Sequence, residues 1–550
     1  MVGAAILRGI LRYWGYGLGY LVIFLTPTPA LVCAQNLQDP TLGVVEAASG
    51  FSLPIGMEFL ATNDFLVIEK NSGQVRRVIA GVIQPQPALV LDVDTANERG
   101  LLGIVKHPGF ATNNFIYLCH TPSAGNCVCI QRYTWNGSAL VDPTDIFSFP
   151  TFTGISNHQG GVMTFGPDGK LYAVTGDHGQ FGPLQNQPTG PLDDTSVIVR
   201  LNDDGSIPAD NPLAVAAGDA VKYYAYGIRN SFGMAFDPLS GELWNTENGA
   251  QAYDEINRVL PGFNSGWREI MGPAARNPSG TNNLVNLTGG QYADPVFSWL
   301  ETVAPTGLVF LNSTALGSAY ENDLFVGDFN NGYLYHFDLN AQRDALALTG
   351  GLSDTVADNA NELDSVVLGT GFDGISSLKV GPDGKLYVVS LFQGKIYAVT
   401  EVSGSDLAIT RLKAPKKIKL PVRPKTVTVT LQNRGPANVT FSNLSTLTNL
   451  IQIQIESLGD CPTPTATIVP PKKLPVTLAP ERKITLRYTV TFDCANDAGS
   501  GSGREDYRFT ARINPYDDPN SANNECPRPP VSVDKGCNKG RLVLTDVHQQ

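Results

Sequence analysis

A turn followed by a short apolar strand recurs along most of this chain and constrains its fold more than any other feature. Residues 166–172 and 381–387 both read Gly-Pro-Asp-Gly-Lys-Leu-Tyr. In such a turn proline presets φ and glycine accepts a positive φ, so the chain reverses immediately before the strand. Four weaker copies, each with Asp, Asn or Gly before an apolar run, begin near residues 63, 113, 237 and 322.

Six copies between residues 45 and 400 amount to about 50 to 60 residues per repeat, which is typical of a β-propeller built from four-stranded blades. The composition agrees, with 56 Gly, 38 Pro and only 16% charged residues. No long segment keeps the 3.6-residue apolar period of a helix. The alternative is two ordinary sandwiches whose turns resemble each other by chance.

A second domain is predicted after the repeats. Residues 401–424 form a Lys- and Pro-rich linker and the start of a sandwich, and residues 425–516 contain alternating strands typical of an immunoglobulin-like β-sandwich. Residues 517–550 form a polar tail. The predicted fold class is therefore all-β: a six-bladed β-propeller followed by an immunoglobulin-like β-sandwich.

The N-terminus predicts export. Two arginines within the first 12 residues precede an apolar stretch at 18–25, and Val32 and Ala34 suit the −3 and −1 positions of a cleavage site. Residues 1–34 are thus predicted to be a signal peptide, and the mature protein to be periplasmic or secreted. A retained membrane anchor would need a longer apolar core, of about 20 residues. A lipid anchor on Cys33 would need a smaller residue before it.

Cysteine usage agrees with an oxidising compartment. The sequence leaves disulfide connectivity open. The candidates are Cys461 and Cys494, Cys526 and Cys537, and the group Cys119, Cys127 and Cys129. No histidine cluster near this group supports a zinc site.

Three residues at repeat boundaries suggest proton chemistry. His158 precedes the strand of the third repeat and Asp177 follows it, so both can meet on one rim of a propeller. A carboxylate that holds a histidine ring fixes its tautomer and lets it act as a general base. Arg229 opens the next repeat and can offset developing negative charge. His107 and Asp168, by contrast, are interpreted as turn residues.

The charge distribution excludes one class of partner. The formal net charge is −12, and basic residues cluster only around Lys416 and Lys417. Phosphate backbones require clustered cations, so nucleic acid is not expected as the main partner.

An ordered set of motifs resembles the soluble glucose/sorbosone dehydrogenase family, whose fold is a six-bladed propeller. The resemblance covers roughly residues 45–400. The motifs are Glu98-Arg99-Gly100-Leu101-Leu102-Gly103, His107-Pro108-Gly109-Phe110, Asn157-His158-Gln159-Gly160-Gly161, 166–172 through Gly176-Asp177, Tyr226-Gly227-Ile228-Arg229-Asn230, Asp254-Glu255-Ile256-Asn257 and 261–267.

The resemblance implies an enzyme that uses pyrroloquinoline quinone (PQQ) with calcium to oxidise an aldose or a related sugar or alcohol, passing electrons to an external acceptor. His158 would take the proton of the anomeric hydroxyl as hydride passes to the quinone. Asp177 would orient His158, and Arg229 would stabilise the reduced quinone and the transition state. The cofactor supplies the redox chemistry and the protein supplies binding and electrostatics.

The resemblance also implies binding residues. Those expected to line the cofactor pocket are Glu98, Asn230 and Asn248. The Gly249 carbonyl is expected as a calcium ligand there. Asp254 and Glu255 are candidates for a structural calcium site, the alternative being a merely solvated carboxylate pair in a blade turn.

One departure bears on the cofactor. Where the family has a lysine and an arginine pair that bind the quinone carboxylates, this chain has Asn330, Gly374 and Ser376. Each lost charged hydrogen bond costs roughly 1.5–3 kcal/mol. A second hypothesis is therefore a non-catalytic extracellular propeller that binds glycan or protein, with the sandwich as a further recognition module. A calcium-dependent lactonase is disfavoured because the sequence offers no further acidic ring at the hub.

Overall fold

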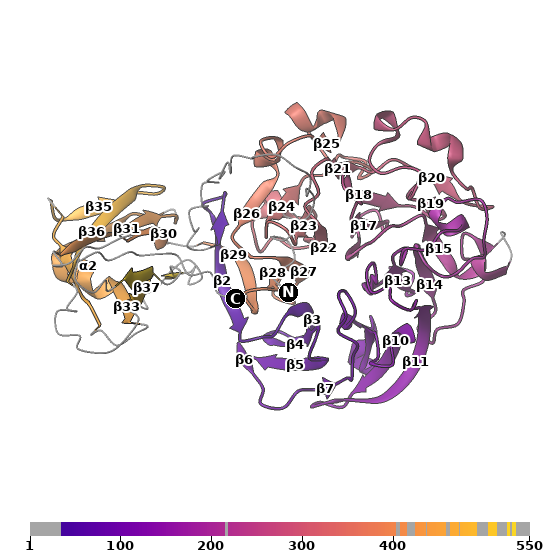
Figure 1. The fold of residues 1–550 in the computed structure, drawn as a ribbon, viewed down its shortest axis with the longest axis horizontal. Coiled ribbons are helices and arrows are strands. Elements are labelled where there is room, and N and C mark those ends of the chain that lie inside the picture. Colours follow the sequence, from indigo (N-terminus) through magenta and orange to yellow (C-terminus); the bar gives the residue numbers. More distant parts are fainter. Residues whose placement is uncertain are drawn as a thin grey trace, which may run out of the picture. The chain divides into compact units, whose positions relative to one another are not determined.

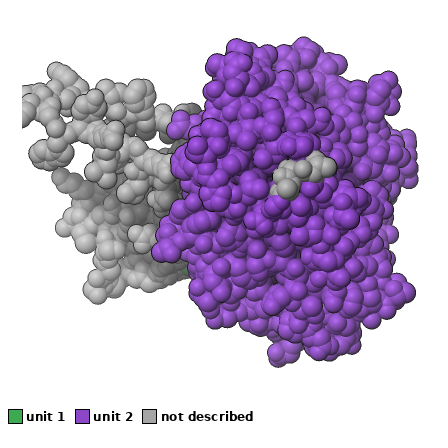
Figure 2. Space-filling view, turned by 90° about the vertical axis from the view of Figure 1, so that its right-hand side faces the viewer, with its two compact units in different colours: residues 1–34, 405–518, 523–550 green, residues 35–404, 519–522 purple. Residues whose placement is uncertain are grey.

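The structure is a computed structural model, and the residues it describes are 35–214, 218–402, 407–414, 424–435, 437–457, 463–471, 473–491, 504–513, 525–527 and 531–534. The chain divides into two compact units. We call the one that covers Gln35–Gly404 the first unit (purple, labelled unit 2 in Figure 2), and the one that includes Ser405–Asp518 the second unit. The predicted signal peptide lies outside the described residues. Within the described ranges, no helix combines the length and the apolar character that crossing a membrane requires.

The first unit contains six mainly antiparallel sheets, which we number as blades 1 to 6. Blade 1 comprises β3 (Pro54–Ala61), β4 (Asp64–Glu69), β5 (Gln74–Ile79), β6 (Val82–Ile83) and β7 (Leu89–Val90). Blade 2 comprises β8 (Leu101–Lys106), β9 (Phe115–His120), β10 (Cys127–Trp135) and β11 (Leu140–Pro150), with α1 (Phe110–Asn113) between β8 and β9. Blade 3 comprises β12 (Met163–Phe165), β13 (Leu171–Thr175), β14 (Val197–Leu201) and β15 (Tyr223–Tyr226), extended by β19 (Phe263–Asn264) and β20 (Gln291–Tyr292).

The remaining three blades follow in chain order. Blade 4 comprises β16 (Gly233–Phe236), β17 (Leu243–Glu247), β18 (Asp254–Val259), β21 (Phe297–Trp299) and β25 (Val356–Ala357). Blade 5 comprises β22 (Pro305–Phe310), β23 (Leu324–Asp328), β24 (Leu334–Phe337), β26 (Val367–Thr370) and β1 (Asn36–Leu37). Blade 6 comprises β27 (Ile375–Val380), β28 (Leu386–Ser390), β29 (Lys395–Glu401) and β2 (Leu42–Ser49).

The six blades form a closed ring (Figure 1). Their first strands, β3, β8, β12, β16, β22 and β27, contact one another in cyclic order around the axis. The N-terminal strand β2 pairs with β29 and so completes the last blade with an early part of the chain. The structure confirms the predicted six-bladed propeller. The unit begins at Gln35 rather than at residue 45, because β1 is too short to leave an alternating pattern in the sequence.

The repeated turns have the geometry that their residues predict. Gly169 and Gly384 have φ of 72° and 78°. Tyr172 donates a hydrogen bond of 2.9 Å to Asp168, and Tyr387 donates one of 3.2 Å to Asp383. The aspartates are thus turn residues that also fix the following strand.

Neighbouring blades pack face to face through apolar side chains. One core joins Val174 and Ile198 of blade 3 to Met234 and Leu243 of blade 4. Both faces of the middle strands are buried: β13 is largely apolar, whereas β17 also buries the polar side chains of Asn245, Thr246 and Glu247. A channel of about 540 Å³ follows the axis between the first strands of all blades.

The second unit has two main sheets around one hydrophobic core. The first sheet contains β30 (Leu407–Lys413), β31 (Lys425–Asn433), β36 (Lys483–Thr491) and β34 (Thr465–Val469). The second contains β33 (Ile451–Ser457), β37 (Arg504–Ile513), β38 (Glu525–Pro527) and β39 (Val531–Asp534), and β32 (Val439–Phe441) pairs with β35 (Val476–Leu478). Helix α2 (Leu444–Leu450) begins after Asn443, whose side chain accepts a hydrogen bond from the Thr446 amide. The immunoglobulin-like class of this domain stays a prediction.

Candidate active site

The strand ends of blade 3 meet at one edge of its sheet. Thr175 at the end of β13 pairs with Val197 at the start of β14, which pairs in turn with Tyr226 at the end of β15. Asp177 follows β13 and Arg229 follows β15, so both residues emerge at this edge. We call this edge of the propeller the catalytic rim; it comprises loops 151–161, 176–186, 227–231, 248–253, 329–333, 371–374 and 391–394.

Backbone hydrogen bonds join the three predicted catalytic residues. The Gly176 amide donates to the His158 carbonyl over 3.1 Å, and the Asp177 amide donates to the Arg229 carbonyl over 2.9 Å. A Cβ at Gly176 would lie 2.5 Å from the Arg229 carbonyl oxygen and 2.6 Å from that of His158. Only glycine allows this approach, and the structure thereby brings His158, Asp177 and Arg229 together.

Asp177 holds the His158 ring in place. Its Oδ1 lies 2.5 Å from His158 Nδ1 and accepts the Gly179 amide over 2.8 Å, while its Oδ2 accepts Trp267 Nε1 over 2.7 Å. Burial opposes ionisation of this carboxyl, but the hydrogen bonds outweigh it and lower the pKa of Asp177. An ionised Asp177 accepts the Nδ1 proton, so Nε2 of the neutral ring keeps its lone pair.

A second histidine beside Asp177 has a different environment. His178 is fully buried, and its Nε2 lies 2.8 Å from Thr175 Oγ1. Burial lowers the pKa of His178 to about 4, so it stays neutral at physiological pH. The His158 side chain is 14% exposed. His158 is therefore the histidine of this pair that a substrate can reach.

Arg229 is fixed by carbonyl groups and an aromatic ring. Its Nη1 donates to the carbonyls of Asn248 and Gly249 over 2.8 and 2.9 Å. Its guanidinium carbon lies 5.2 Å from the centroid of the Trp267 ring. The predicted calcium ligand Gly249 thus directs its carbonyl toward Arg229 in this structure.

The three residues predicted to line a cofactor pocket lie together, because Asn230 contacts Glu98 and the Asn248 amide donates to the Asn230 carbonyl over 2.7 Å. Glu98 accepts the Gln159 amide over 3.1 Å and Asn230 Nδ2 over 3.4 Å, and burial raises the pKa of its carboxyl. Among the described residues, four polar atoms here are buried without a hydrogen-bond partner: Gln159 Oε1, Arg229 Nε, Asn230 Oδ1 and Asn248 Oδ1. An unpaired buried polar atom costs about 1–3 kcal/mol, so this concentration fits a site that takes a polar ligand.

The structure separates the two predicted carboxylate ligands of calcium. Asp254 accepts the backbone amides of Gly249, Val303 and Ala304 over 2.6–2.7 Å, which occupies both of its oxygens. Glu255, its neighbour on β18, points to the opposite face as strand alternation requires.

Glu255 instead lies near Glu247, and both accept hydrogen bonds from the amide of Asn257, over 3.1 and 3.4 Å. Burial raises the pKa of both glutamates, and the charge of Glu247 raises that of Glu255 further. Burial also raises the pKa of Asp254, to about 6. Glu247 and Glu255 thus form a pair of buried carboxyls that share one amide beside the site.

Blades 5 and 6 complete the catalytic rim without cations at the anchoring positions. Thr306 links the blades, because it accepts a bond from Thr246 of blade 4 and donates one to the Ile375 carbonyl of blade 6. Asn330 donates to the Thr302 carbonyl over 3.2 Å, and Ser376 donates to the Pro54 carbonyl over 2.8 Å.

Aromatic rings occupy the same part of the rim. Phe329 and Phe392 lie 5.3 Å apart, and 38% and 47% of their surfaces are exposed. A Cβ at Gly374 would lie 2.7 Å from Phe392 Cδ2. This side of the site therefore lacks a cation at these positions and is partly apolar, and the exposed Asp373 lies in the same loop as Gly374.

Two residues that sequence reasoning left without a role contribute to the site. Trp267 holds Asp177 from the side opposite His158 and packs against Arg229. Arg268, the next residue, packs against the exposed ring of Phe181. The tryptophan lies in a motif of the resembling family, whereas nothing in the local sequence connects Arg268 with Asp177.

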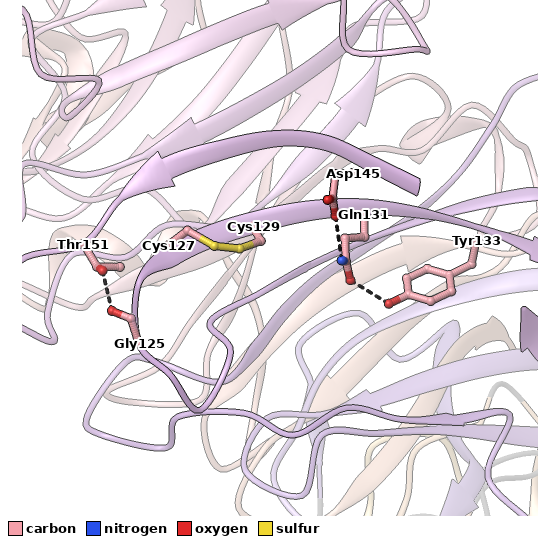
Figure 3. Close-up of a disulfide and its surroundings, with 7 residues drawn as sticks. All are labelled: Gly125, Cys127, Cys129, Gln131, Tyr133, Asp145 and Thr151. Atoms are coloured by element: carbon pink, nitrogen blue, oxygen red, sulfur yellow. Dashed lines mark hydrogen bonds between the residues drawn. A yellow bond between two sulfur atoms is a disulfide. The ribbon is translucent and has the colours of Figure 1, made fainter. Parts of the chain in front are cut away.

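The cysteine group lies in blade 2. Cys127 and Cys129 of β10 form a disulfide, and Figure 3 shows Gln131 of the same strand between Asp145 and Tyr133. Cys119 is a free, buried thiol whose pKa burial raises to about 12. The side chains of the C-terminal cysteines Cys461, Cys494, Cys526 and Cys537 lie outside the description.

Comparison with known proteins agrees with this geometry. The profile of the Glucose / Sorbosone dehydrogenase family matches residues 51–398. The aldose sugar dehydrogenase YliI of Escherichia coli is 29% identical over 378 residues, which cover 67% of this chain and 95% of the relative. The quinoprotein glucose dehydrogenase B of Acinetobacter calcoaceticus is 35% identical over 237 residues, which cover 38% of this chain and 47% of the relative.

A solved structure is also similar to this chain. The PQQ-bound aldose sugar dehydrogenase of Streptomyces coelicolor matches with a TM-score of 0.50 and 25% identity, over 67% of this chain and 98% of that protein. Because the family profile spans more than half of the chain, the protein belongs to the glucose/sorbosone dehydrogenase family. It is thus an oxidoreductase of the propeller type, as the motifs predicted.

Proposed function

We propose that this protein is an exported, PQQ-dependent dehydrogenase that oxidises an aldose or a related sugar or alcohol, with His158 as the general base. The observation that carries the proposal is the hydrogen-bond chain Trp267–Asp177–His158, which leaves one ring nitrogen of a partly exposed histidine able to accept a proton. The substrate is a sugar and an external acceptor completes the turnover, in keeping with the relatives named above.

Residues of this chain take up the proton that the sugar hydroxyl releases. Nε2 of His158 accepts the hydroxyl proton of the sugar, and the ring becomes an imidazolium. Asp177, which is already ionised and hydrogen-bonded to Nδ1, stabilises that positive charge. Trp267 and Gly179 keep the carboxylate in its orientation, so no reorganisation is needed during the transfer.

Arg229 stabilises the negative charge that develops as the sugar hydroxyl loses its proton. Its guanidinium is held by two carbonyls and by Trp267, and its buried Nε has no partner among the described residues. This leaves donor capacity directed into the site, where negative charge develops as the hydroxyl loses its proton. A fixed donor in a partly desolvated site typically contributes about 2.7–4 kcal/mol to transition-state stabilisation.

The residues present fit a polar cofactor in part. Glu98, Asn230 and Asn248 would hold it. The buried, unpaired Oδ1 atoms of Asn230 and Asn248 can accept hydrogen bonds from such a ligand, and Glu98 lies beside them in contact with Asn230. When bound, the quinone supplies a two-electron acceptor for the hydride that leaves the sugar carbon. Calcium would be held near the Gly249 carbonyl, as the resemblance implies, and Glu255 with Glu247 forms a second oxygen-rich position for it.

A second candidate function rests on blades 5 and 6. With neutral residues at 330, 374 and 376 and exposed rings at 329 and 392, a propeller that binds glycan or protein without catalysis accounts for this part of the rim. In that case the second unit would act as a further recognition module.

One titration separates the two functions. Purified protein is stripped with a chelator, then titrated with PQQ and calcium while absorbance is followed, and aldose-dependent dye reduction is measured. Saturable absorbance change with turnover supports the dehydrogenase. No change up to about 100 µM quinone, together with binding to immobilised glycans, would favour the binding function. Sequencing the N-terminus of protein recovered outside the cytoplasm tests export, for which a new terminus at Gln35 is expected.

A further inference from the structure

Arg268 is set apart from the other arginines of the propeller. It lies on the connection from β19 to β20, directly after Trp267, and its backbone amide donates to the Gln185 carbonyl over 3.0 Å. Within the described part of the propeller, every other arginine donates a hydrogen bond from its guanidinium to a protein acceptor, whereas the Arg268 guanidinium has none. Its Nε is buried and unpaired.

The position of this cation connects it to the active site. Its guanidinium carbon lies 3.8 Å from the centroid of the Phe181 ring and 5.3 Å from that of Trp267. Trp267 is the residue that donates to Asp177 and that also packs against Arg229, at 5.2 Å. Phe181 follows Asp177 by four residues and is 62% exposed. Arg268 therefore packs between the exposed ring of Phe181 and Trp267, the residue that contacts Asp177.

The acidic residue nearest in sequence does not neutralise Arg268. Glu269 accepts Gln187 Nε2 over 2.6 Å and Asn283 Nδ2 over 3.0 Å, so its carboxylate is engaged on other groups. A guanidinium stacked on an aromatic ring is partly dehydrated and held in one plane, while its N–H edges remain free to bind. This planar fork matches a carboxylate, which it binds through two parallel hydrogen bonds.

We propose that Arg268, supported by Phe181, is a carboxylate-binding residue beside the active site. The proposal rests on the proposed dehydrogenase function and deepens it. The carboxylate comes from one of two ligands of the same chemistry: the tricarboxylate quinone, whose expected cationic anchors at 330, 374 and 376 are missing, or an acidic sugar such as a uronic acid. Either source explains an unpaired cation beside the catalytic histidine.

The test compares Arg268→Gln with wild type and with Arg276→Gln. Arg276 is a matched control on the same connection, because it is an exposed cation that pairs with Asp354 and Asp358. Each protein is titrated calorimetrically with PQQ plus calcium and, separately and without quinone, with glucuronate and with glucose. Turnover of both sugars is then measured at saturating quinone. Thermal melting verifies that each variant is folded.

The expected results distinguish the two sources. If the quinone supplies the carboxylate, Arg268→Gln weakens PQQ binding about 10- to 100-fold and leaves the KM of both sugars unchanged. If an acidic sugar supplies it, PQQ affinity is unchanged, while glucuronate binding and its KM worsen by the same factor and glucose does not respond. Arg268→Lys should recover only part of the loss, because lysine lacks the fork, and Phe181→Leu should weaken binding about two- to fivefold.

Other results would overturn the proposal. If Arg268→Gln matches Arg276→Gln in the PQQ, glucuronate and glucose titrations alike, Arg268 binds no carboxylate. Failure of the dehydrogenase function is separate, because it removes quinone binding and turnover from wild type. In that event the glucuronate titration without quinone tests the carboxylate site by itself. Weaker glucuronate binding in the Arg268 variants alone supports the site. Equal glucuronate binding in wild type and in the Arg268 variants contradicts the proposal.

Discussion

The two sides of the catalytic rim differ sharply in chemistry. On blades 3 and 4, His158, Asp177 and Arg229 are tied by hydrogen bonds to one another and to Trp267. On blades 5 and 6, the corresponding positions 330, 374 and 376 carry no cation. Asn330 and Ser376 bond to backbone carbonyls, and the same loops hold the exposed ring pair of Phe329 and Phe392 and the exposed Asp373. The groups that we propose to move a proton are present, whereas the groups that would anchor carboxylates are absent from their expected positions.

This difference teaches that proton transfer and charge anchoring are separable in this fold. A general base needs only an oriented imidazole and its carboxylate, which blade 3 supplies almost alone. Anchoring a tricarboxylate needs cations from several blades. Among the described arginines of the propeller, the one whose guanidinium has no hydrogen-bond partner is Arg268, which lies on the side of His158 and Asp177. The four predictions below test whether the two sides act independently.

Replacing His158 should have the largest effect. His158→Ala removes the proton acceptor, which typically contributes about 10²- to 10⁴-fold to rate. We expect kcat for dye reduction to fall by that factor, with quinone affinity unchanged because the ring is not an anchor. His107→Gln, a change of a turn histidine away from the rim, is the control. A large loss of quinone affinity in His158→Ala would mean that the two sides are coupled.

Replacing Asp177 should reduce activity by a smaller factor. Asp177→Asn keeps the shape but removes the charge that stabilises the imidazolium and fixes its tautomer, and we expect kcat to fall about 100-fold. The pH–rate profile should change as well, because His158 loses its carboxylate partner. Trp267→Phe, which removes one hydrogen bond to Oδ2, should cost about tenfold or less. Equal kcat values for Asp177→Asn and wild type would contradict the proposed base.

Adding a cation at position 330 of blade 5 tests whether this side of the rim contacts the quinone. Asn330 is exposed, and its side chain donates a hydrogen bond to the Thr302 carbonyl. Asn330→Lys should tighten quinone binding about tenfold, the gain of one charged hydrogen bond in a partly exposed site. Thr314→Lys places the same charge beyond the other end of β22 and should have no effect. If both variants bind the quinone as wild type does, position 330 does not face the ligand.

The smallest effect concerns the buried carboxyls beside the site. The pKa values of Glu247 and Glu255 are raised by burial, so the folded protein keeps protons that the unfolded chain releases above about pH 4.3. The stability that these groups contribute is present below that pH and is lost as pH rises through their raised pKa values. With chelator present, the melting temperature should therefore fall by a few degrees between about pH 5 and 8.

Glu247→Gln should flatten that pH dependence, because glutamine can keep the bonds to Arg229 and Ser265 without titrating. Glu301→Gln, an exposed position, should leave the slope as in wild type. Calcium added in excess should also flatten the wild-type curve if the cation binds between Glu247 and Glu255. A wild-type melting temperature that rises over this range would contradict the assignment.

The sequence by itself determined the architecture. Turn residues such as Gly169 and Gly384 fix local chain reversal, and short apolar runs between them can only pack as sheets, so the number of repeats gave the number of blades. The family and the participation of His158, Asp177 and Arg229 followed from ordered motifs. These features are local, or they repeat at a fixed spacing, and both kinds of pattern can be recognised in a single amino-acid sequence.

Tertiary structure decided what the sequence could not. The closure of the ring by β2 and β29, the separation of Asp254 from Glu255, the contact of Trp267 with Asp177, and the free guanidinium of Arg268 all depend on residues far apart in the chain. Whether a charged group is paired or free depends on which partners folding brings within about 3 Å. That distance is set by the packing of whole blades, and no local pattern of residues encodes it.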